Sequence, residues 1–299
     1  MRPWGMRTVA RTAAGLALAG AAGLVYARWE AQAFTLRRAE VPVLPAGQPA
    51  MRILHLSDLH LVPGQRTKQA WVRSLREVRP DAVVVTGDFL SHPDAVPHVL
   101  DTLEPLFDLP GAFVLGSNDY YAPKPLNPAR YLRGPSQLEP NRPMLPWGDL
   151  VDGLVAGGWL DLGNRRGTLK IDGREVDVRG VDDPHIRRDR YNDVAGAFAA
   201  DADLALGVTH APYLRVLDAM AVDGADLVLA GHTHGGQLCV PGVGALVTNC
   251  DLPRSKAKGL STHGDAALHV SAGLGTSPYA PVRFACRPEA TLLTLTARG

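Results

Sequence analysis

Residues able to bind metal ions occur in five short clusters of this sequence, each directly after an apolar stretch. The clusters are Asp58-Leu59-His60, Gly87-Asp88, Ser117-Asn118-Asp119, Thr209-His210 and Gly231-His232-Thr233-His234. An apolar run that ends in polar residues is typical of a buried strand, which carries those residues to the carboxyl edge of a sheet. Open α/β folds bind their ligands at that edge. The sequence therefore predicts one site at which five strands end.

The ligand types in these clusters predict two metal ions rather than one. Three carboxylates, one amide and four imidazoles exceed what one ion needs, and oxygen and nitrogen donors without thiolate favour Mn, Fe or Zn. Two such ions roughly 3.5 to 4 Å apart, bridged by a carboxylate and a hydroxide, are the arrangement used for in-line displacement at phosphorus. Asp88 is the candidate for the bridge, because it lies thirty residues after Asp58 and thirty before Asn118. That spacing is about the length of one βαβ unit.

The order of these clusters resembles the calcineurin-like metallophosphoesterases. The matching motifs are D-x-H at Asp58, G-D at Asp88, a G-N-H-D-like loop at Gly116, H at His210 and G-H-x-H at Gly231. The strings Leu56 to His60, Thr86 to Asp88, Gly231 to Gln237, Gly273 to Ser277 and Pro281 to Phe284 look like the bacterial membrane-associated branch, which hydrolyses phosphodiesters or related phosphate esters. The resemblance covers roughly residues 50 to 297.

The resemblance implies a ligand set for each ion and a fold. The first metal would take Asp58, His60 and His234. The second would take Asn118, His210 and His232, with Asp88 bridging the two. The implied fold is a four-layer α/β/β/α sandwich with the dinuclear site at the carboxyl ends of the strands. Periodicity by itself supports only a mixed α/β class.

One loop departs from the family pattern. An alignment without a gap puts Ser117 where the family has its asparagine ligand, and Asn118 where it has the histidine that acts as general acid. A serine hydroxyl is a poor ligand for a divalent ion and an amide oxygen is a good one, so we expect Asn118 to be the ligand. The general acid then has no direct equivalent. Asp119, His185 or a metal-bound water would protonate the leaving group, or the enzyme would prefer esters whose leaving group needs little help.

Two further segments are candidates for the site. Residues 181–185 close a predicted hairpin and resemble a loop that this branch keeps near its metals, although Asp-Asp-Pro is also ordinary turn chemistry. This segment contributes His185. Arg283 either adds positive charge at the phosphate or forms a salt bridge at the surface.

The composition is that of an ordinary globular enzyme. Of 299 residues, 46% are hydrophobic and 20% charged, and the net charge of +1 gives no reason to expect nucleic-acid binding. The cysteines, Cys239, Cys250 and Cys286, show no C-x-x-C spacing and predict neither a zinc knuckle nor a disulfide framework. The motifs favour a single catalytic domain over residues 51–299.

The N-terminal segment differs in kind from the rest. Sixteen uncharged residues, 12–27, lie between Arg11 and Arg28 and are rich in Ala, Gly and Leu. As a helix they span about 24 Å, short of the roughly 30 Å hydrocarbon core of a bilayer, and arginines and tryptophans at the interfaces can make up the difference. We expect residues 1–30 to be a retained membrane anchor, with a cleaved signal segment and a secreted enzyme as the alternative. A slight excess of positive charge before the helix puts the catalytic domain on the outer side of the cytoplasmic membrane.

Periodicity and turn residues outline the remaining elements. Residues 31–50 contain Pro42, Pro45 and Pro49 and are predicted to be a linker or an edge strand, because proline blocks helix and central-strand pairing. Strands are predicted at 51–56, 81–86, 112–115, 168–171, 175–180, 204–209 and 227–230, and helices at 66–79, 94–106, 147–157 and 214–220. Strands at 237–240, 268–271 and 291–295 are typical of a second sheet. The proline-dense stretch 122–146 is either a lid on the substrate side or a tolerated insertion.

These patterns together predict a membrane-anchored, metal-dependent phosphoesterase whose expected substrate is a phosphodiester. A hydroxide bridging the metals would attack phosphorus in line, while the metals and nearby imidazoles stabilise the equatorial oxygens. A phospholipid or a nucleotide-sugar lipid fits an enzyme tethered to a bilayer. Two other classes remain open. One is a non-catalytic anchored protein that binds metal or phosphate, and the other is a different dinuclear-metal hydrolase, although the metallo-β-lactamase type expects an H-x-H-x-D-H cluster early in the chain.

Overall fold

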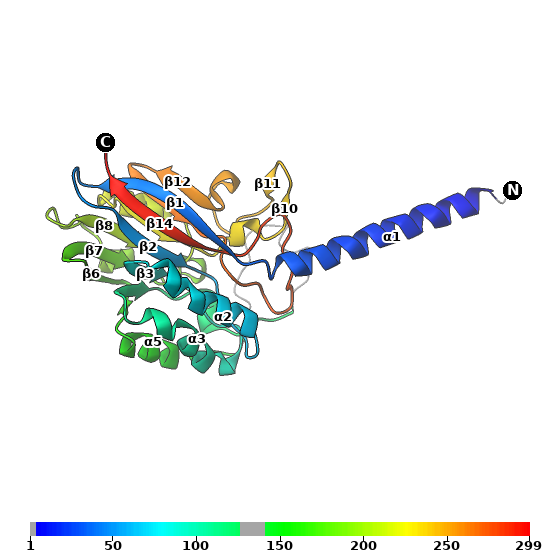
Figure 1. Ribbon diagram of the computed structural model, residues 1–299, viewed down its shortest axis with the longest axis horizontal. Helices are drawn as coiled ribbons and strands as arrows, with labels where there is room; N and C mark the ends of the chain where they lie inside the picture. Colours follow the sequence, from blue (N-terminus) through cyan, green and yellow to red (C-terminus); the bar gives the residue numbers. More distant parts are fainter. Residues whose placement is uncertain (1–3, 126–140) are drawn as a thin grey trace.

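Two six-stranded sheets lie face to face in the centre of the domain (Figure 1). The computed structural model of the chain describes residues 4–125 and 141–299, without the side chains of 4–10 and 13. The first sheet has the order β1 (Thr35–Leu44), β14 (Glu289–Ala297), β2 (Met51–Leu56), β3 (Ala82–Val85), β4 (Gly111–Phe113) and β5 (Leu160–Asp161). The second has the order β12 (Gly259–His263), β13 (Ala266–Val270), β9 (Leu227–Ala230), β8 (Leu204–Val208), β7 (Arg174–Gly180) and β6 (Arg165–Ile171).

The central strands of both sheets run parallel, so their carboxyl ends lie at one edge. β2, β3, β4 and β5 are parallel to one another, as are β7, β8, β9 and β13. Antiparallel pairing occurs toward the margins, where β14 pairs with β2, β6 with β7 and β12 with β13. This geometry delivers the polar residues that follow the central strands to a common region.

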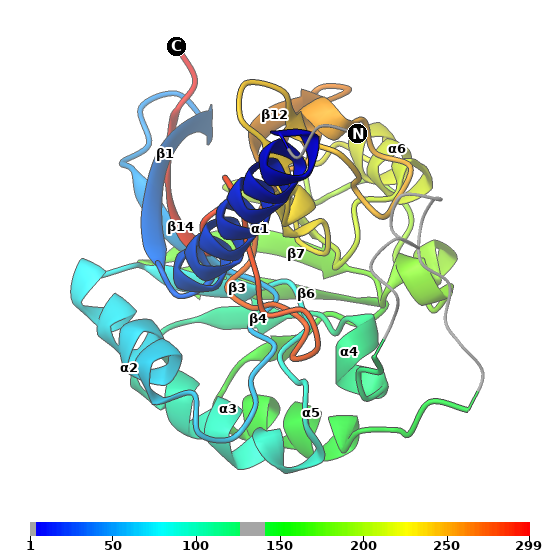
Figure 2. The same ribbon diagram turned by 90° about the vertical axis from the view of Figure 1, so that its right-hand side faces the viewer.

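Each sheet has one face toward the other sheet and one face toward helices. Along β3, Val84 lies in the core between the sheets, whereas Val83 and Val85 lie under the helices, as the alternation of side chains along a strand requires. Helices α2 (Arg66–Ser74), α3 (Val96–Leu103) and α5 (Trp147–Ala156) cover the first sheet, and α6 (Leu214–Val222) packs on the second (Figure 2). The predicted four-layer α/β/β/α sandwich is confirmed.

The segment predicted as a linker or an edge strand, 31–50, forms an edge strand of the first sheet over most of its length. β1 pairs in parallel with β14 from Thr35 opposite Glu289 onward, with a shift of register after Pro42. Proline is tolerated there because β1 is an edge strand and one side of it needs no donor. The folded domain therefore begins near residue 35 rather than residue 51, a correction to the predicted boundary.

Two late strands differ from their predicted places. Residues 291–295 lie in β14, which belongs to the first sheet rather than the second. The segment 237–240 forms only the short strand β10 (Cys239–Val240), which pairs with β11 (Gly244–Ala245) in a separate hairpin. The pattern of residues in a segment indicates whether it forms a strand but not which strand it pairs with. These two sheet assignments were wrong for that reason.

Helix α1 (Trp4–Glu30) projects from the domain, and its far end makes no contact with the sheets (Figure 1). Its last turn is fixed to the domain, because the buried carboxylate of Glu30 accepts the N–H groups of Ala285 and Cys286 at 2.9 and 3.0 Å. Within the described residues, no helix combines the length and the apolar character needed to cross a membrane. The membrane anchor expected at residues 1–30 stays a prediction.

Most of the stretch predicted as a lid or an insertion, 126–140, lies outside the described residues. Its flanks are held in place. Ala122 donates its N–H to the carbonyl of Pro143, and Arg142 Nε donates to the carbonyl of Ala122 at 2.9 Å.

Candidate metal centre

Five segments that follow strands converge at the carboxyl edge of the two sheets, as the sequence predicted. Asp58 follows β2, Asp88 follows β3 and His232 follows β9. Asn118 lies in the short helix α4 (Ser117–Tyr120) after β4, and His210 follows β8. Two sheets thus contribute to a single cluster of side chains.

Four of the candidate ligands form a compact group. One ligand atom from each of Asp58, His60, Asp88 and His234 lies within 4.8 Å of the other three. His60 Nε2 is 3.2 Å from His234 Nε2 and 3.4 Å from Asp88 Oδ2, and His234 Nε2 is 3.6 Å from Asp58 Oδ1. These are the three residues expected around the first metal, together with the expected bridge.

Asp88 also contacts the residues expected around the second metal. The Nε2 atom of His210 lies 3.5 Å from Asp88 Oδ2. The backbone N–H of Asn118 donates to Asp88 Oδ1 and the side-chain amide donates to Asp88 Oδ2, both at 2.8 Å. His232 packs against His210 with their ring centroids 5.2 Å apart. Asp88 therefore lies between the two sets of residues.

The donor atoms of the cluster fit a metal ion. Asp58 Oδ1 and His210 Nε2 are buried without any hydrogen-bond partner, and buried unpaired polar atoms are costly unless something else satisfies them. The facing imidazole nitrogens of His60 and His234 would likewise be better satisfied by a cation between them than by each other. A divalent ion between Asp58, His60 and His234 would satisfy three of these atoms, and a second ion beside His210 would satisfy the fourth.

The second nitrogen of three imidazoles is already occupied by a protein group. His60 Nδ1 contacts Ser91 Oγ at 3.0 Å, and His210 Nδ1 contacts the carbonyl of Thr86 at 2.6 Å. His232 Nε2 contacts the carbonyl of Asn249 at 3.1 Å. Such partners fix the ring orientation and leave the other nitrogen for a metal. In His232 that nitrogen is Nδ1, and in the other two it is Nε2.

Backbone strain is concentrated in the candidate ligands. The φ angles of Asp58, His60, Asp88, His232 and His234 are 50°, 44°, 55°, 69° and 50°, in the left-handed region that residues other than glycine rarely adopt. Strained backbone persists where the surrounding structure enforces it, and it gathers at functional sites. Glycines allow the loops to approach each other: a Cβ on Gly116 would lie 2.3 Å from Asp88 Oδ1, and one on Gly231 would lie 1.9 Å from Ser57 Oγ.

Burial keeps most of the site's imidazoles neutral, which is the form that binds metals. Desolvation lowers the pKa of His60 to about 4, against the charge of Asp88, and lowers the pKa values of His232 and His234 well below the usual range. His210 differs. Burial alone would lower its pKa, but Asp88, Asp183 and Asp58 outweigh that effect and raise the pKa to about 9.

Asp119 joins the loops that carry the other ligands. Its fully buried carboxylate accepts the N–H groups of Asp88 at 2.8 Å and of Leu90 and Gly116 at 2.9 Å. Burial, together with the charge of Asp88, raises the pKa of Asp119 to about 8. Both of its oxygens are engaged by backbone groups, so Asp119 is positioned to hold the loops after β3 and β4 together.

His185 lies beside the cluster, at the end of the loop 181–185. Its ring packs on His232 with centroids 4.5 Å apart, and its Nδ1 lies 3.0 Å from the hydroxyl of Tyr213. Burial is the main cause that lowers the pKa of His185 to about 4. The half-buried ring thus lies at the edge of the cluster, next to His232.

Arg283 has neither of the two roles predicted for it. Its guanidinium is fully buried and donates to the carbonyls of Ala272, Gly273 and Gly275 at 2.8, 3.1 and 2.7 Å. It also contacts His234 Nδ1 at 3.3 Å. Arg283 thus supports the loop that carries His234. The sequence shows only that a positive charge occurs at position 283, not that the side chain is buried.

A buried chain of hydrogen bonds leads to Asp58 from between the sheets, and no sequence motif pointed to it. His269 Nδ1 and His55 Nδ1 are 2.8 Å apart, and His55 Nε2 is 2.9 Å from Thr86 Oγ1. Thr86 Oγ1 donates to Ser57 Oγ at 2.7 Å, and Ser57 Oγ donates to Asp58 Oδ2 at 2.5 Å. Asp58 Oδ2 is thereby occupied, which leaves Oδ1 facing the cluster.

Asp183 was also missed, although it lies in the loop singled out. Its Oδ1 accepts the N–H of His185 at 2.8 Å, whereas its Oδ2 is buried without a hydrogen-bond partner. Burial raises the pKa of Asp183 to about 7, although the charge of the nearby His210 acts to lower it. The residue therefore adds negative charge close to the second half of the site.

Comparison with known proteins agrees with this geometry. Residues 51–236, which carry all of the strand-end clusters, match the family described as calcineurin-like phosphoesterase. The chain belongs to the calcineurin-like phosphoesterase family. It is accordingly a hydrolase of phosphoric esters, and its Asp and His cluster indicates dependence on divalent metal ions.

Two relatives named as metallophosphoesterases match most of the chain, and a phosphodiesterase matches a shorter stretch. The Bacillus subtilis protein named uncharacterized metallophosphoesterase YkoQ is 30% identical over 254 residues, covering 83% of this chain and 84% of that protein. A Danio rerio protein named transmembrane protein with metallophosphoesterase domain is 29% identical over 280 residues, covering 86% of this chain and 56% of that protein. The Escherichia coli phosphodiesterase YaeI is 46% identical over 70 residues, covering 23% of this chain and 25% of that protein.

Proposed function

We propose that this metallophosphoesterase hydrolyses phosphodiesters with two divalent transition-metal ions, Mn, Fe or Zn. The observation that carries the proposal is the position of Asp88, which lies 3.4 Å from His60 Nε2 and 3.5 Å from His210 Nε2. A carboxylate between two groups of imidazoles is suited to bridge two cations. Asp58, His60 and His234 would hold the first ion, and Asn118, His210 and His232 the second.

The ions would supply the nucleophile and the positive charge that stabilises the phosphate in the transition state. The protein's own residues hold the ligands in place. Ser57 and the N–H of His232 hold one oxygen of Asp58, at 2.5 and 3.1 Å. Asp119 fixes the backbone around Asp88 by accepting the N–H groups of Asp88 and Leu90. Preorganised groups of this kind need not reorganise during the reaction, which is a major source of catalysis.

His185 is the side chain best placed to handle the proton of the leaving group. Its ring borders the second half of the site, and Tyr213 fixes its orientation. Asp119 is a poorer candidate, because three backbone N–H groups occupy its carboxylate. An imidazole with a low pKa is mostly neutral at pH 7 and gives little help to a poor leaving group. We therefore propose that the enzyme prefers phosphodiesters whose leaving group has a low pKa and can depart as an anion without being protonated.

The substrate class and location are proposed from the relatives and from α1. The match to a protein named phosphodiesterase favours a diester over a monoester. The match to a protein named as transmembrane, together with the projecting helix α1, favours association with a membrane. The catalytic domain would lie on the outer side, since Arg2, Arg7, Arg11 and the amino terminus precede the apolar part of α1.

The test is an assay of the full chain after chelation and after addition of Mn²⁺, Fe²⁺ or Zn²⁺. Bis(p-nitrophenyl) phosphate and p-nitrophenyl phosphate serve as diester and monoester. We expect metal-dependent hydrolysis that is faster on the diester, and its loss in a His210→Ala variant. Faster hydrolysis of the monoester would overturn the preference for diesters. Metal binding without hydrolysis of either ester would instead indicate a binding protein.

A further inference from the structure

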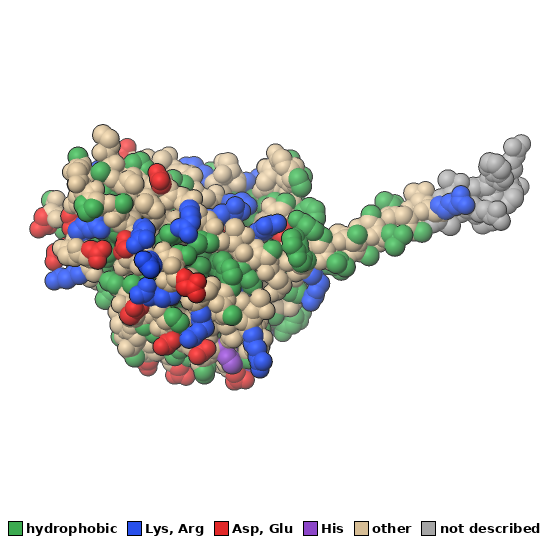
Figure 3. Space-filling model, viewed as in Figure 1, with side chains coloured by type: hydrophobic (Ala, Val, Ile, Leu, Met, Phe, Trp, Pro, Cys, Tyr) green, Lys and Arg blue, Asp and Glu red, His purple; other side chains and the backbone are tan. Residues whose placement is uncertain are grey.

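Exposed apolar side chains from three segments gather where α1 leaves the domain, and we call them the basal patch. They are Leu24, Val25, Tyr26 and Trp29 of α1, Leu238, Val240, Val243 and Leu246 in and around the β10–β11 hairpin, and Tyr279 of the loop 273–286. Val243 is 72% and Tyr279 56% exposed. Figure 3 shows hydrophobic side chains over the hairpin and the base of the helix. Large exposed apolar groups that cluster in this way mark an interaction surface.

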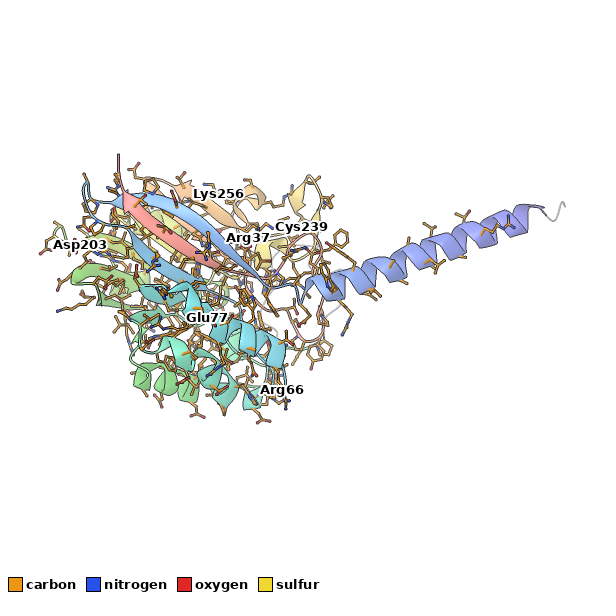
Figure 4. All side chains as sticks on the ribbon, in the orientation of Figure 1. Arg37, Arg66, Glu77, Asp203, Cys239 and Lys256 are labelled. Carbon is orange, nitrogen blue, oxygen red and sulfur yellow. The ribbon has the colours of Figure 1, made fainter. Side chains whose placement is uncertain are left out.

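Contacts between the three segments make the basal patch one continuous surface. The ring of Tyr26 lies 5.7 Å from that of Trp29 and 5.5 Å from that of Phe284 in the loop. Arg283 donates its N–H to the carbonyl of Ala27 at 2.9 Å. The hairpin joins the same loop through Cys239, which lies at its base (Figure 4) and donates its N–H to the carbonyl of Phe284 at 2.8 Å.

The basal patch borders the metal centre. Leu238 is four residues after His234 and follows the short helical turn η7 (His234–Gly236). The loop 273–286 begins against the other side of the centre, where Gly275 donates its N–H to the carbonyl of Asp58 at 2.6 Å, and it ends at α1. Both the hairpin and the loop thus run directly from candidate ligands to the patch. Helix α1 leaves the domain at the end that faces the viewer in Figure 2.

The chemistry of this end fits an anionic lipid bilayer. The first 38 residues contain six arginines, of which Arg37 pairs with Glu289, and a single acidic residue, Glu30, whose carboxylate is buried against Ala285 and Cys286. Arg287 lies over the ring of Trp29 at 5.6 Å. Along α1, Leu18 is 72% exposed, and Figure 4 shows side chains that point into open space around the helix. Apolar and aromatic groups combined with arginines are typical of surfaces that enter the headgroup region of anionic membranes.

We propose that the basal patch docks onto an anionic bilayer with the metal centre beside the contact, so that the substrate is a phosphodiester whose organic part lies in that bilayer. The substrate class rests on the proposed phosphodiesterase function, whereas the docking does not. Contact at headgroup depth needs the hairpin, the aromatic rings and the arginines, and it requires no helix that spans the membrane. A soluble substrate would gain nothing from a site placed beside such a surface.

The experiment compares the full chain with a Val243→Asp/Leu246→Asp variant of the hairpin. The matched control is Val222→Asp at the end of α6, the helix that packs on the second sheet, where the Val222 side chain is 84% exposed. Each protein is sedimented with vesicles of phosphatidylglycerol and phosphatidylcholine and with vesicles of phosphatidylcholine alone. Hydrolysis is measured on bis(p-nitrophenyl) phosphate in solution and on phosphatidylglycerol in the vesicles.

We expect the full chain and the control to bind the anionic vesicles, and the hairpin variant to lose about tenfold or more in binding or in hydrolysis of the vesicle lipid. Hydrolysis in solution should be equal in all three, which shows that the hairpin variant is folded. Equal binding and equal vesicle hydrolysis in all three would overturn the proposal. Self-association of the full chain that the variant abolishes, without vesicle binding, would show that a second copy covers the patch. Vesicle binding without any hydrolysis would refute the phosphodiesterase function and leave the docking surface intact.

Discussion

Asn118 holds both carboxylate oxygens of Asp88, through its backbone N–H to Oδ1 and its side-chain amide to Oδ2, each at 2.8 Å. The loop that departs from the family pattern is therefore attached to the proposed bridging carboxylate by its asparagine. We propose that the amide oxygen of Asn118 binds the second metal ion. No histidine of this loop takes the place of the general acid of the family.

Replacement of Asn118 should separate the two possible alignments of this loop. We expect Asn118→Ala to lower metal occupancy by about one ion per chain, because an amide ligand and a hydrogen bond to Asp88 are lost together. Ser117→Ala is the matched control and should leave occupancy unchanged. The reverse pattern, measured by metal analysis of the purified variants, would show that Ser117 is the ligand.

Asp88→Asn should remove most of the phosphodiesterase activity, at least about 100-fold, because the neutral amide cannot hold two cations. Metal content should fall in parallel. Asp108→Asn, which changes an exposed carboxylate paired with Arg76 at 2.7 Å, controls for the loss of one negative charge. Turnover and metal content that both match the unmodified enzyme would exclude Asp88 as the bridge.

Thr86 belongs to the chain of hydrogen bonds that ends at Asp58, so its replacement should change the metal affinity although Thr86 is not a candidate ligand. Thr86→Val removes the hydroxyl between His55 and Ser57, and loss of such supporting partners typically weakens metal binding about 10- to 100-fold. Thr86→Ser should restore the affinity. Thr102→Val, which removes a buried hydroxyl that donates to the carbonyl of His98, is a control for a general loss of stability. Titration with Mn²⁺ measures the effect, and equal affinity in Thr86→Val and the unmodified protein would exclude a role for the chain.

Metal binding should release a proton from His210. In the metal-free protein, Asp88, Asp183 and Asp58 raise the pKa of this residue to about 9, so the ring is charged at pH 7 and must become neutral to bind an ion. Affinity should therefore rise with pH until about pH 9 and then level off. Calorimetric titration in two buffers of different ionisation enthalpy counts the protons. The same raised pKa stabilises the metal-free fold at pH values below the ordinary histidine pKa of 6.5, and that contribution is lost as the pH rises through about 9.

The rate of hydrolysis should depend on the leaving group more strongly than in relatives whose histidine acts as general acid. A positioned general acid typically accelerates the reaction by about 10²- to 10⁴-fold. Rates on a series of aryl phosphodiesters should fall steeply as the pKa of the leaving group rises. Asn118→His should flatten the slope if the new side chain reaches the scissile bond. A shallow slope in the unmodified enzyme would identify another proton donor, and His185→Gln and Asp119→Asn would show which of the two residues it is.

The candidate ligands could be located from the sequence because they lie in segments that follow buried strands. The position of Asp58 after β2, of Asp88 after β3 and of His210 after β8 depends only on local pattern and on the parallel arrangement. Long-range pairings were not predictable. Arg37 pairs with Glu289 over 252 residues of sequence, and His55 meets His269 over 214, and nothing in the local sequence of either partner specifies the other.

The same limit applies to the buried charges. A carboxylate that accepts three backbone N–H groups, as Asp119 does, has the same sequence signature as one that binds a metal. Arg283 has the signature of an exposed phosphate-binding arginine, and only its contacts with Ala272 and Gly275 show that it supports a loop. Roles of this kind depend on the direction of a side chain, which the strand pattern leaves open.

The central claim is that two metal ions at this cluster perform phosphodiester hydrolysis. Its most direct test is to titrate the metal-free full chain with Mn²⁺ or Zn²⁺ and to follow hydrolysis of bis(p-nitrophenyl) phosphate at each addition. We predict that activity rises until about two equivalents are bound per chain and that Asp88→Asn abolishes the rise. Full activity of the metal-free protein, or saturation of activity at one equivalent, would contradict the account.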